Sequence, residues 1–95
     1  MALSDDRLRG ITPFVATVEH GSFTAAAESL HLTSSAVSKS VARLEERLGS
    51  RLFERTTRSL APTEAGQAFY DTCTRVLNEL AEAEAVLAAQ RTIPV

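Results

Sequence analysis

The sequence contains little of what catalysis or metal binding requires. It has one cysteine, two histidines and no tryptophan among 95 residues. Cys73 cannot form an internal disulfide, which agrees with a reducing compartment. One cysteine and two histidines without ligand spacing do not make a zinc site, and no Gly-rich phosphate loop is present. We therefore expect no enzyme activity, no metal and no cofactor in this chain.

Long hydrophobic runs are also missing. No apolar run approaches the roughly 20 residues that a transmembrane helix needs. The first ten residues, MALSDDRLRG, are too acidic and polar for a signal peptide. With 44% hydrophobic and 23% charged residues, the composition is near the average of soluble globular proteins, and the length suffices for one modest core. We expect a cytoplasmic protein that does not contact a membrane.

The formal net charge of −2 is small, but the charge is unevenly distributed. Residues 31–60 carry +3, whereas residues 61–95 carry −3 and residues 1–30 carry −2. Binding of a charged partner depends on the local field within about 8–10 Å of the surface rather than on the total charge. The net acidity therefore does not exclude a polyanionic partner for residues 31–60.

The stretch 33–49, TSSAVSKSVARLEERLG, has a clear helical pattern. Its apolar residues recur at spacings of four, three and four, as on one buried stripe of an α-helix: Val37, Val41, Leu44 and Leu48. Thr33 can cap the first turn, and Gly49 can take the left-handed conformation that ends a helix. The face opposite the stripe collects Ser35, Ser38, Lys39, Ala42, Arg43 and Glu46.

Small polar side chains in the first two turns of this helix suit it to the major groove of DNA, because nothing bulky keeps its backbone from the base edges. The alternative is an ordinary amphipathic surface helix. The residues of 33–48 alone favour this alternative, and the neighbouring elements reverse the preference.

A shorter helix is predicted directly before it. Ser22 is a suitable N-cap for residues 23–30, which are rich in alanine. Small alanines allow another helix to approach closely, and only His31 and Leu32 precede the Thr33 cap. Two helices joined this tightly, the second with a polar face, are typical of a helix-turn-helix.

The first helix of the chain contains two residues that disfavour helices. Its apolar residues recur at helical spacing up to a stop at His20 and Gly21. Gly10 and Pro13 lie inside this pattern, and proline removes a hydrogen bond from a helix interior. Either the helix is kinked near residues 9–12, or a short turn precedes a helix that restarts with Thr12 as cap and Pro13 at its first position.

A small hairpin is predicted after Gly49. Residues 52–54 and 59–61 are each long enough for a short strand, joined by a loop of residues 55–58. The loop carries two arginines and two threonines, which suit phosphate contacts or a narrow minor groove: Arg55, Thr56, Thr57 and Arg58. The alternative is a solvated loop, but beside a helix-turn-helix the hairpin indicates a wing. We expect Arg58 to reach the minor groove or its phosphates, and Arg55 to be partly structural through Glu54 or the domain body.

The last predicted element is a helix of roughly 25 residues that Thr63 caps. Its apolar residues recur at spacings of 4, 3, 4, 3 and 4, a heptad seam: Phe69, Cys73, Val76, Leu80, Ala83 and Leu87. A core this small is not expected to cover the whole seam, so we expect a partner, with Cys73 as a small buried hydrophobe. Residues 91–95, RTIPV, lose the pattern and are predicted to form a tail or the start of a linker.

The stretch from Phe14 to Gly66 resembles the N-terminal DNA-binding domain of LysR-type transcriptional regulators. The resemblance rests on FVATVEHGSFTAAAESLHLTSSAVSKSVARLEERLGSRLFERTTR followed by APTEAG. It implies a mainly α fold, a winged helix-turn-helix with three helices and a short β-hairpin, followed by a long dimerisation helix. This chain has Ser34-Ser35 where the family often has Gln-Pro or Pro-Ser, and Lys39 where arginine is frequent. The family's usual glutamine-to-base contact therefore cannot be carried over.

The resemblance also implies partners. These are double-stranded DNA, a second copy paired antiparallel through the long helix, and possible tetramers of the full-length protein. A C-terminal domain for a small-molecule effector is implied and is absent from this chain, so we expect a fragment rather than a short homologue. The expected division is 1–62 for the DNA-binding domain, 63–90 for the dimerisation helix and 91–95 for the tail.

The candidate site residues follow from these elements. The candidate DNA contacts are Ser22, Thr24, Thr33, Ser34, Ser35, Ser38, Lys39, Arg43, Arg55, Thr56, Thr57 and Arg58. The candidate dimer contacts are the six seam residues of the last helix. A second hypothesis is a protein-interaction module in which the long helix is the functional surface, and the net acidity supports it.

Overall fold

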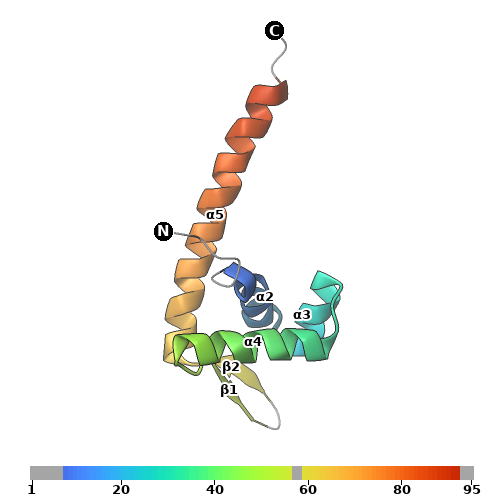
Figure 1. Cartoon of the computed structure of the whole chain (residues 1–95), viewed down its shortest axis with the longest axis vertical. Helices are drawn as coiled ribbons and strands as arrows, with labels where there is room; N and C mark the ends of the chain where they lie inside the picture. Colours follow the sequence, from blue (N-terminus) through green and yellow to red (C-terminus); the bar gives the residue numbers. More distant parts are fainter. Residues whose placement is uncertain (1–7, 57–58, 93–95) are drawn as a thin grey trace.

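The computed structural model describes residues 8–56 and 59–92. Within them the elements are α2 (Ile11–His20), α3 (Phe23–Leu30), α4 (Ser34–Leu48), β1 (Phe53–Arg55), β2 (Leu60–Pro62) and α5 (Glu64–Thr92). The first three helices and the hairpin form one packed group, and α5 extends from it as a rod (Figure 1). The mainly α, winged helix-turn-helix prediction is confirmed. None of the helices in the described residues is long and apolar enough to cross a membrane.

The start of α2 agrees with the second predicted alternative except for its cap. Leu8 and Arg9 have helical backbone, Gly10 interrupts it, and α2 begins at Ile11. The helix thus restarts, but Gly10 rather than Thr12 is its N-cap residue. Pro13 is tolerated because it is the third residue of α2, where the backbone N–H has no intrahelical partner to lose.

The helix-turn-helix forms as predicted. The Ser22 hydroxyl caps α3 by accepting a hydrogen bond from Ala25 N–H at 3.0 Å, and Thr33 caps α4 by accepting one from Ala36 N–H at 3.0 Å. Between the helices, His31 takes a left-handed conformation (φ 57°). Its backbone N–H donates to carbonyl groups at the end of α3, as a C-cap does.

Alanines allow α3 to approach its neighbours closely. Ala26 and Ala27 are 0% and 3% exposed, and they form a small core cluster with Ala16 of α2 and Val37 of α4. No side chain at positions 26 and 27 is larger than a methyl group, so the helices can pack with short interaxial distances. This packing fixes the angle at which α4 leaves the domain surface.

The hairpin is displaced by one residue from its prediction. Strand β1 begins at Phe53, and the antiparallel register pairs Phe53 with Pro62 and Arg55 with Leu60. Leu52 precedes the strand; its N–H donates to a side chain of α4, and its carbonyl accepts from Thr63 N–H at 2.9 Å. Arg55 therefore belongs to a strand and not to the loop, while Thr57 and Arg58 lie outside the described residues.

The main core is aromatic at its centre. Phe14 of α2 is fully buried, and its ring centroid lies 5.6 Å from that of Phe53 and 5.4 Å from that of Phe69. These tilted contacts join α2 to β1 and to α5, and offset aromatic pairs add to the stabilisation from area burial. Cys73 of α5 is 4% exposed in the same cluster, as predicted for a small hydrophobe. Its burial raises the pKa of the thiol.

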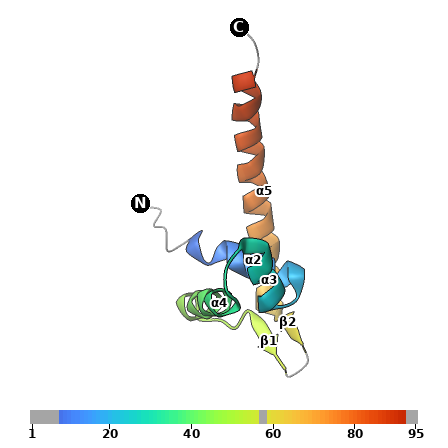
Figure 2. The ribbon, with the colours of Figure 1, turned by 90° about the vertical axis from the view of Figure 1, so that its right-hand side faces the viewer.

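Helix α5 is longer than predicted. The Thr63 hydroxyl accepts from Gly66 N–H at 3.0 Å and donates to the Arg51 carbonyl at 2.7 Å, which ties the start of the helix to the loop before β1. The helix runs to Thr92, so residues 91 and 92 are helical and not part of a tail; residues 93–95 lie outside the described residues. In Figure 2 the distal part of α5 stands clear of all other described elements.

At Gly66, α5 lies directly against the backbone that precedes β1. A Cβ atom there would overlap the carbonyl oxygen of Leu52. In an exposed helix, Gly→Ala stabilises by roughly 0.5–1 kcal/mol. Here we expect Gly66→Ala to lower the free energy of unfolding by about 1–3 kcal/mol, because backbone atoms must move. Urea denaturation measures the change.

Gly49→Ala is the matched control. Gly49 has φ +69°, and a Cβ atom added there would meet nothing within 4 Å, so its substitution tests backbone conformation without a clash. We expect a cost of about 1–2 kcal/mol from the left-handed conformation. A Gly66→Ala protein at least as stable as the unsubstituted one would show that the contact with Leu52 does not constrain α5.

Candidate nucleic-acid interface

The start of α4 presents a slim polar face. Val37, Val41 and Leu44 are at most 2% exposed, and they seat the helix on the core. On the outward side Ser34, Ser35 and Lys39 are exposed, as Thr33 is, while Ser38 is partly exposed. The hydroxyl of Ser38 donates to the Ser35 carbonyl at 3.5 Å, a long and therefore weak hydrogen bond. The arrangement leaves short hydrogen-bonding groups and one cation accessible from outside.

Predicted contact residues from three elements meet beside this face. An open hollow of about 400 Å³ is lined by residues from the starts of α3 and α4 and from the hairpin. The candidates among its lining residues are Ser22, Thr24, Ser34, Arg55 and Thr56. Positions more than 30 residues apart in sequence thus share one surface, and Figure 1 shows the hairpin projecting next to α4.

Thr56 is already engaged in the hairpin turn. Its hydroxyl accepts from Ser59 N–H at 2.9 Å, and its backbone N–H donates to the Ser59 carbonyl at 2.9 Å. Thr57 and Arg58, between these two residues, lie outside the described part of the chain. The predicted contacts by Thr57 and Arg58 therefore stay predictions.

Glu45 holds the hairpin onto α4, and the sequence reasoning did not identify this role. The residue is 8% exposed, and its Oε2 accepts hydrogen bonds from Leu52 N–H at 2.8 Å and Phe53 N–H at 3.2 Å. Oε1 accepts from Arg55 Nη2 at 3.0 Å. Burial alone raises the pKa of Glu45, but the hydrogen bonds from Leu52, Arg55 and Phe53 outweigh it and bring the pKa below its ordinary value of 4.5.

Arg55 has a structural partner in the domain body, one of the two predicted alternatives. We expected Glu54 or the domain body, and the partner is Glu45 of α4 rather than Glu54. The guanidinium carbon of Arg55 also lies 5.7 Å from the ring centroid of Phe23, within cation–π range. A sequence signal existed: Glu45 adjoins Leu44 and follows Val41 by four residues, so it borders the buried stripe and needs a partner.

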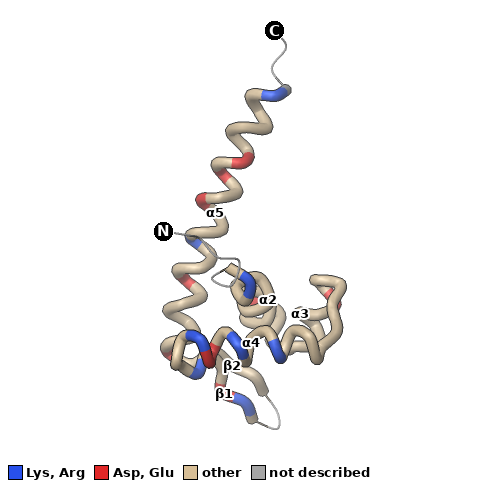
Figure 3. The backbone as a smooth tube through the Cα atoms, viewed as in Figure 1, with Lys and Arg blue, Asp and Glu red and all other residues tan. Residues whose placement is uncertain are grey.

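The charges separate along the molecule. Figure 3 shows lysine and arginine gathered on α4, on the loop after it and on β1, with most acidic positions of α5 on the extended rod. The five described cations of this block, Lys39, Arg43, Arg47, Arg51 and Arg55, thus lie at one end of the molecule. A polyanion is attracted to this end, and the rod carries the compensating negative charge.

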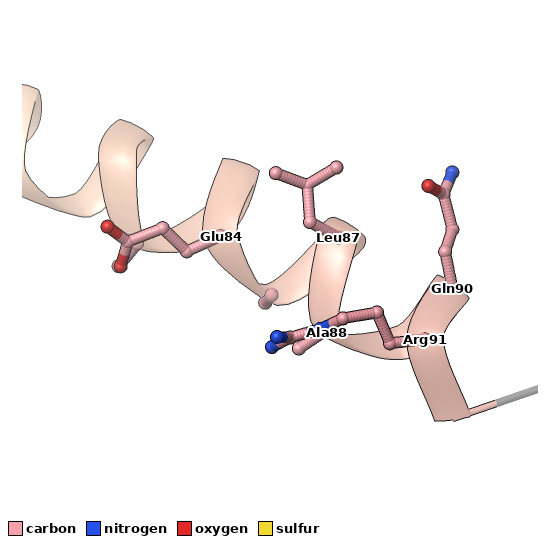
Figure 4. A pocket seen from close by; sticks show the side chains of 7 residues that line it. Glu84, Leu87, Ala88, Gln90 and Arg91 are labelled. Carbon is pink, nitrogen blue, oxygen red and sulfur yellow. The ribbon is translucent and has the colours of Figure 1, made fainter.

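The predicted seam of α5 divides into two parts. Cys73 is buried and Phe69 partly buried against the domain, so these two residues mainly serve the chain's own core and Cys73 has almost no surface for a partner. Val76, Leu80 and Leu87 are 47%, 55% and 61% exposed. Figure 4 shows the distal end, where Glu84, Leu87 and Arg91 project from a single helix.

The described residues contain no group of three or more His, Cys, Asp or Glu side chains that could hold a metal ion. The chemistry of the surface is instead that of hydroxyls, one amine and guanidinium groups. Such groups bind phosphates and the edges of bases.

The hydrogen bonds of Glu45 predict a pH-dependent stability. A carboxylate whose folded pKa lies below its unfolded pKa stabilises the fold above the unfolded pKa, and this contribution is lost as pH falls through the folded value. We expect Glu45→Gln to lower the free energy of unfolding at pH 7 by about 1–3 kcal/mol, because an amide satisfies the three donors less well. The difference should shrink below pH 4.5. Urea denaturation between about pH 3 and pH 7 measures it.

Glu46→Gln serves as control because Glu46 is exposed on the same helix. It removes the same charge without touching the hairpin, so its stability difference should stay small and nearly constant with pH. Equal pH profiles for the two variants would contradict the anchoring role of Glu45.

Comparison with known proteins agrees with this geometry. A family model described as "Bacterial regulatory helix-turn-helix protein, lysR family" matches residues 8–67. The HTH-type transcriptional regulator CrgA of Neisseria meningitidis serogroup B is 49% identical over 84 residues, which is 88% of this chain and 28% of CrgA. The HTH-type transcriptional activator AaeR of Escherichia coli K12 is 40% identical over 90 residues, 95% of this chain and 29% of AaeR. The chain thus spans less than a third of the length of these curated relatives.

A solved structure extends the likeness to three dimensions. The complex titled BenM_DBD/catB site 1 DNA superposes with a TM-score of 0.84 at 32% identity, covering 93% of this chain and 98% of that chain. The family model covers well over half of the sequence, and it spans α2 through the first turn of α5. The chain belongs to the LysR family of bacterial regulatory helix-turn-helix proteins.

Proposed function

We propose that this chain is the DNA-binding part of a transcription regulator and not an enzyme. The observation that carries the proposal is the slim, exposed start of α4, flanked on one surface by the start of α3 and by the hairpin. A helix presented in this way fits the major groove, and a hairpin beside it reaches the neighbouring backbone or minor groove. Family membership and the DNA complex of BenM_DBD support the same assignment.

The roles of the residues follow from their positions. Ser34, Ser35 and Lys39 face base edges, with Ser38 beside them. The hydroxyls of Ser22, Thr24 and Thr33 lie near the starts of α3 and α4 and suit phosphate oxygens. Arg43, Thr56, Thr57 and Arg58 complete the proposed contacts with the backbone or minor groove. Arg55 acts mainly by holding the hairpin, because Glu45 and Phe23 engage its guanidinium.

The binding unit in this proposal is a homodimer formed through α5. Its exposed seam residues, Val76, Leu80, Ala83 and Leu87, would be covered by a second α5 in antiparallel orientation. Burying one leucine-sized side chain contributes roughly 1.5–3 kcal/mol, so several at a symmetric contact can offset the cost of association. Two copies would then read an inverted repeat.

The intact regulator, in the same proposal, works in the cytoplasm and joins this part to a domain for a small-molecule effector. The greater length of CrgA and AaeR supports an additional domain. Association of dimers into tetramers is compatible with α5 as the pairing element.

Binding to DNA tests the function directly. A fluorescent duplex from the region upstream of the protein's own gene, chosen by footprinting, is titrated at two salt concentrations beside a scrambled duplex. Affinity for both duplexes should fall steeply with salt, because phosphate contacts release counterions. A protein-interaction module, the second hypothesis, would show no binding to either duplex.

Substitution of Lys39 tests the contact between the start of α4 and DNA. We expect Lys39→Ala to weaken binding by about 1–3 kcal/mol, with relaxed preference at one base pair if the amine contacts a guanine edge. Arg91→Ala removes the same charge in the last turn of α5 and should leave affinity unchanged (Figure 4). Equal affinities for the Lys39→Ala and unsubstituted proteins would remove Lys39 from the interface.

Leu80 tests the dimer. Leu80→Arg places like charges near the two-fold axis of an antiparallel pair, so we expect a folded monomer that binds half-sites weakly. Asn78→Arg is the control, because Asn78 is exposed and lies two residues, about 200°, away from both Val76 and Leu80. Sedimentation at tens of micromolar distinguishes the states. An unsubstituted chain that remains monomeric and binds full sites no better than half-sites would contradict the α5 dimer.

A further inference from the structure

A second hollow lies on α4, apart from the surface that faces the hairpin. Its volume is about 230 Å³, and its lining residues are Arg9, Gly10, Ser40, Arg43, Leu44 and Arg47. Three of these six residues carry guanidinium groups and one carries a hydroxyl.

The close approach of α2 to α4 creates the hollow. A Cβ atom at Gly10 would lie 3.1 Å from Cβ of Leu44, so the backbone before α2 rests directly on α4. This contact brings Arg9 to the same side of α4 as Arg43 and Arg47, although more than 30 residues separate them in sequence. A side chain at position 10 would therefore be in tight contact with Leu44.

The hollow lies on the side of α4 opposite the hairpin. Glu45 points to the hairpin, since its carboxylate accepts hydrogen bonds from Leu52 and Phe53. Arg43 and Arg47 are each two residues from Glu45, which places them about 200° around the helix. Figure 2 agrees, because the start of α2 lies above α4 whereas the hairpin lies below and to its right.

Lys39 lies between the side of α4 that faces the hairpin and the side that carries the hollow. It lies four residues before Arg43, about 40° away around α4, on the exposed face between the hairpin and the hollow. A duplex that receives the start of α4 in its major groove has one phosphate backbone along each side of that helix. The hairpin adjoins one backbone, and the arginine hollow adjoins the other.

We propose that the hollow formed by Arg9, Ser40, Arg43 and Arg47 is a phosphate-binding site that holds a backbone phosphate on the side of α4 away from the hairpin. Guanidinium groups donate paired N–H bonds in a planar arrangement that matches phosphate oxygens, and the Ser40 hydroxyl can donate one more. The apolar floor at Gly10 and Leu44 lowers the local dielectric and strengthens these bonds. The DNA source of the phosphate rests on the proposed function, whereas the site itself does not.

The first arm of the test measures DNA affinity against salt. Arg9→Gln and Arg47→Gln should each lower the slope of log affinity against log salt by about 0.9, the value for one phosphate contact. Arg51→Gln is the matched control, because Arg51 is an exposed arginine near the end of α4 that does not line the hollow. Its slope should equal that of the unsubstituted protein. Circular dichroism verifies that each variant is folded.

The second arm uses inorganic phosphate without DNA. At constant ionic strength, added phosphate should shift the NMR signals of the Arg9, Arg43 and Arg47 side chains, and Ser40→Ala should weaken the shift. Reduced slopes together with these shifts support a site for backbone phosphate. Phosphate shifts with unchanged slopes support the site but assign it to a free phosphate.

Two outcomes separate failure of this inference from failure of the proposed function. The proposed phosphate site would be contradicted if Arg9→Gln and Arg47→Gln leave the salt dependence of DNA affinity unchanged and added phosphate shifts no arginine NMR signal. This holds even where DNA binds normally. Absence of DNA binding by the unsubstituted protein would overturn the proposed function, and the phosphate titration would still decide on the hollow.

Discussion

The buried carboxylate of Glu45 is the interaction on which the shape of the proposed interface depends. One side chain satisfies two backbone N–H groups at the start of β1 and the guanidinium of Arg55. The hairpin has only two strands of three residues each, and an isolated two-stranded hairpin is marginal in water. Its orientation is therefore determined by this contact and by the burial of Leu52 and Phe53. Helix α4 and the hairpin form one unit because Glu45 belongs to the first and bonds to the second.

Small residues control the other contacts that position α4 and α5. Ala26 and Ala27 let α3 lie close to α4, Gly10 lets the start of α2 rest on α4, and Gly66 lets α5 reach the backbone before β1. Close packing of this kind restricts the movement of a helix, since any displacement creates either a void or an overlap. A helix that reads base edges needs this precision, because hydrogen bonds to bases tolerate little displacement.

Local patterns in the sequence were sufficient for most of the fold. Helix boundaries at Thr33 and Gly49 and at Ser22 were predictable because caps act within one turn, and apolar periodicity identified the buried stripe of α4. The family motif identified the winged helix-turn-helix. The seam of α5 was also visible, but its division into buried and exposed parts was not, because periodicity does not say which neighbour covers a residue.

Only the tertiary structure determined the contacts between residues that are distant in sequence. The pairing of Arg55 with Glu45 rather than Glu54, the start of β1 at Phe53 and the meeting of Arg9 with the arginines of α4 all depend on how elements pack. Sequence spacing constrains which side of a helix a residue occupies, whereas packing determines what lies opposite that side. The type and extent of each element thus follow largely from the local sequence, and the composition of the surfaces between elements follows from the fold.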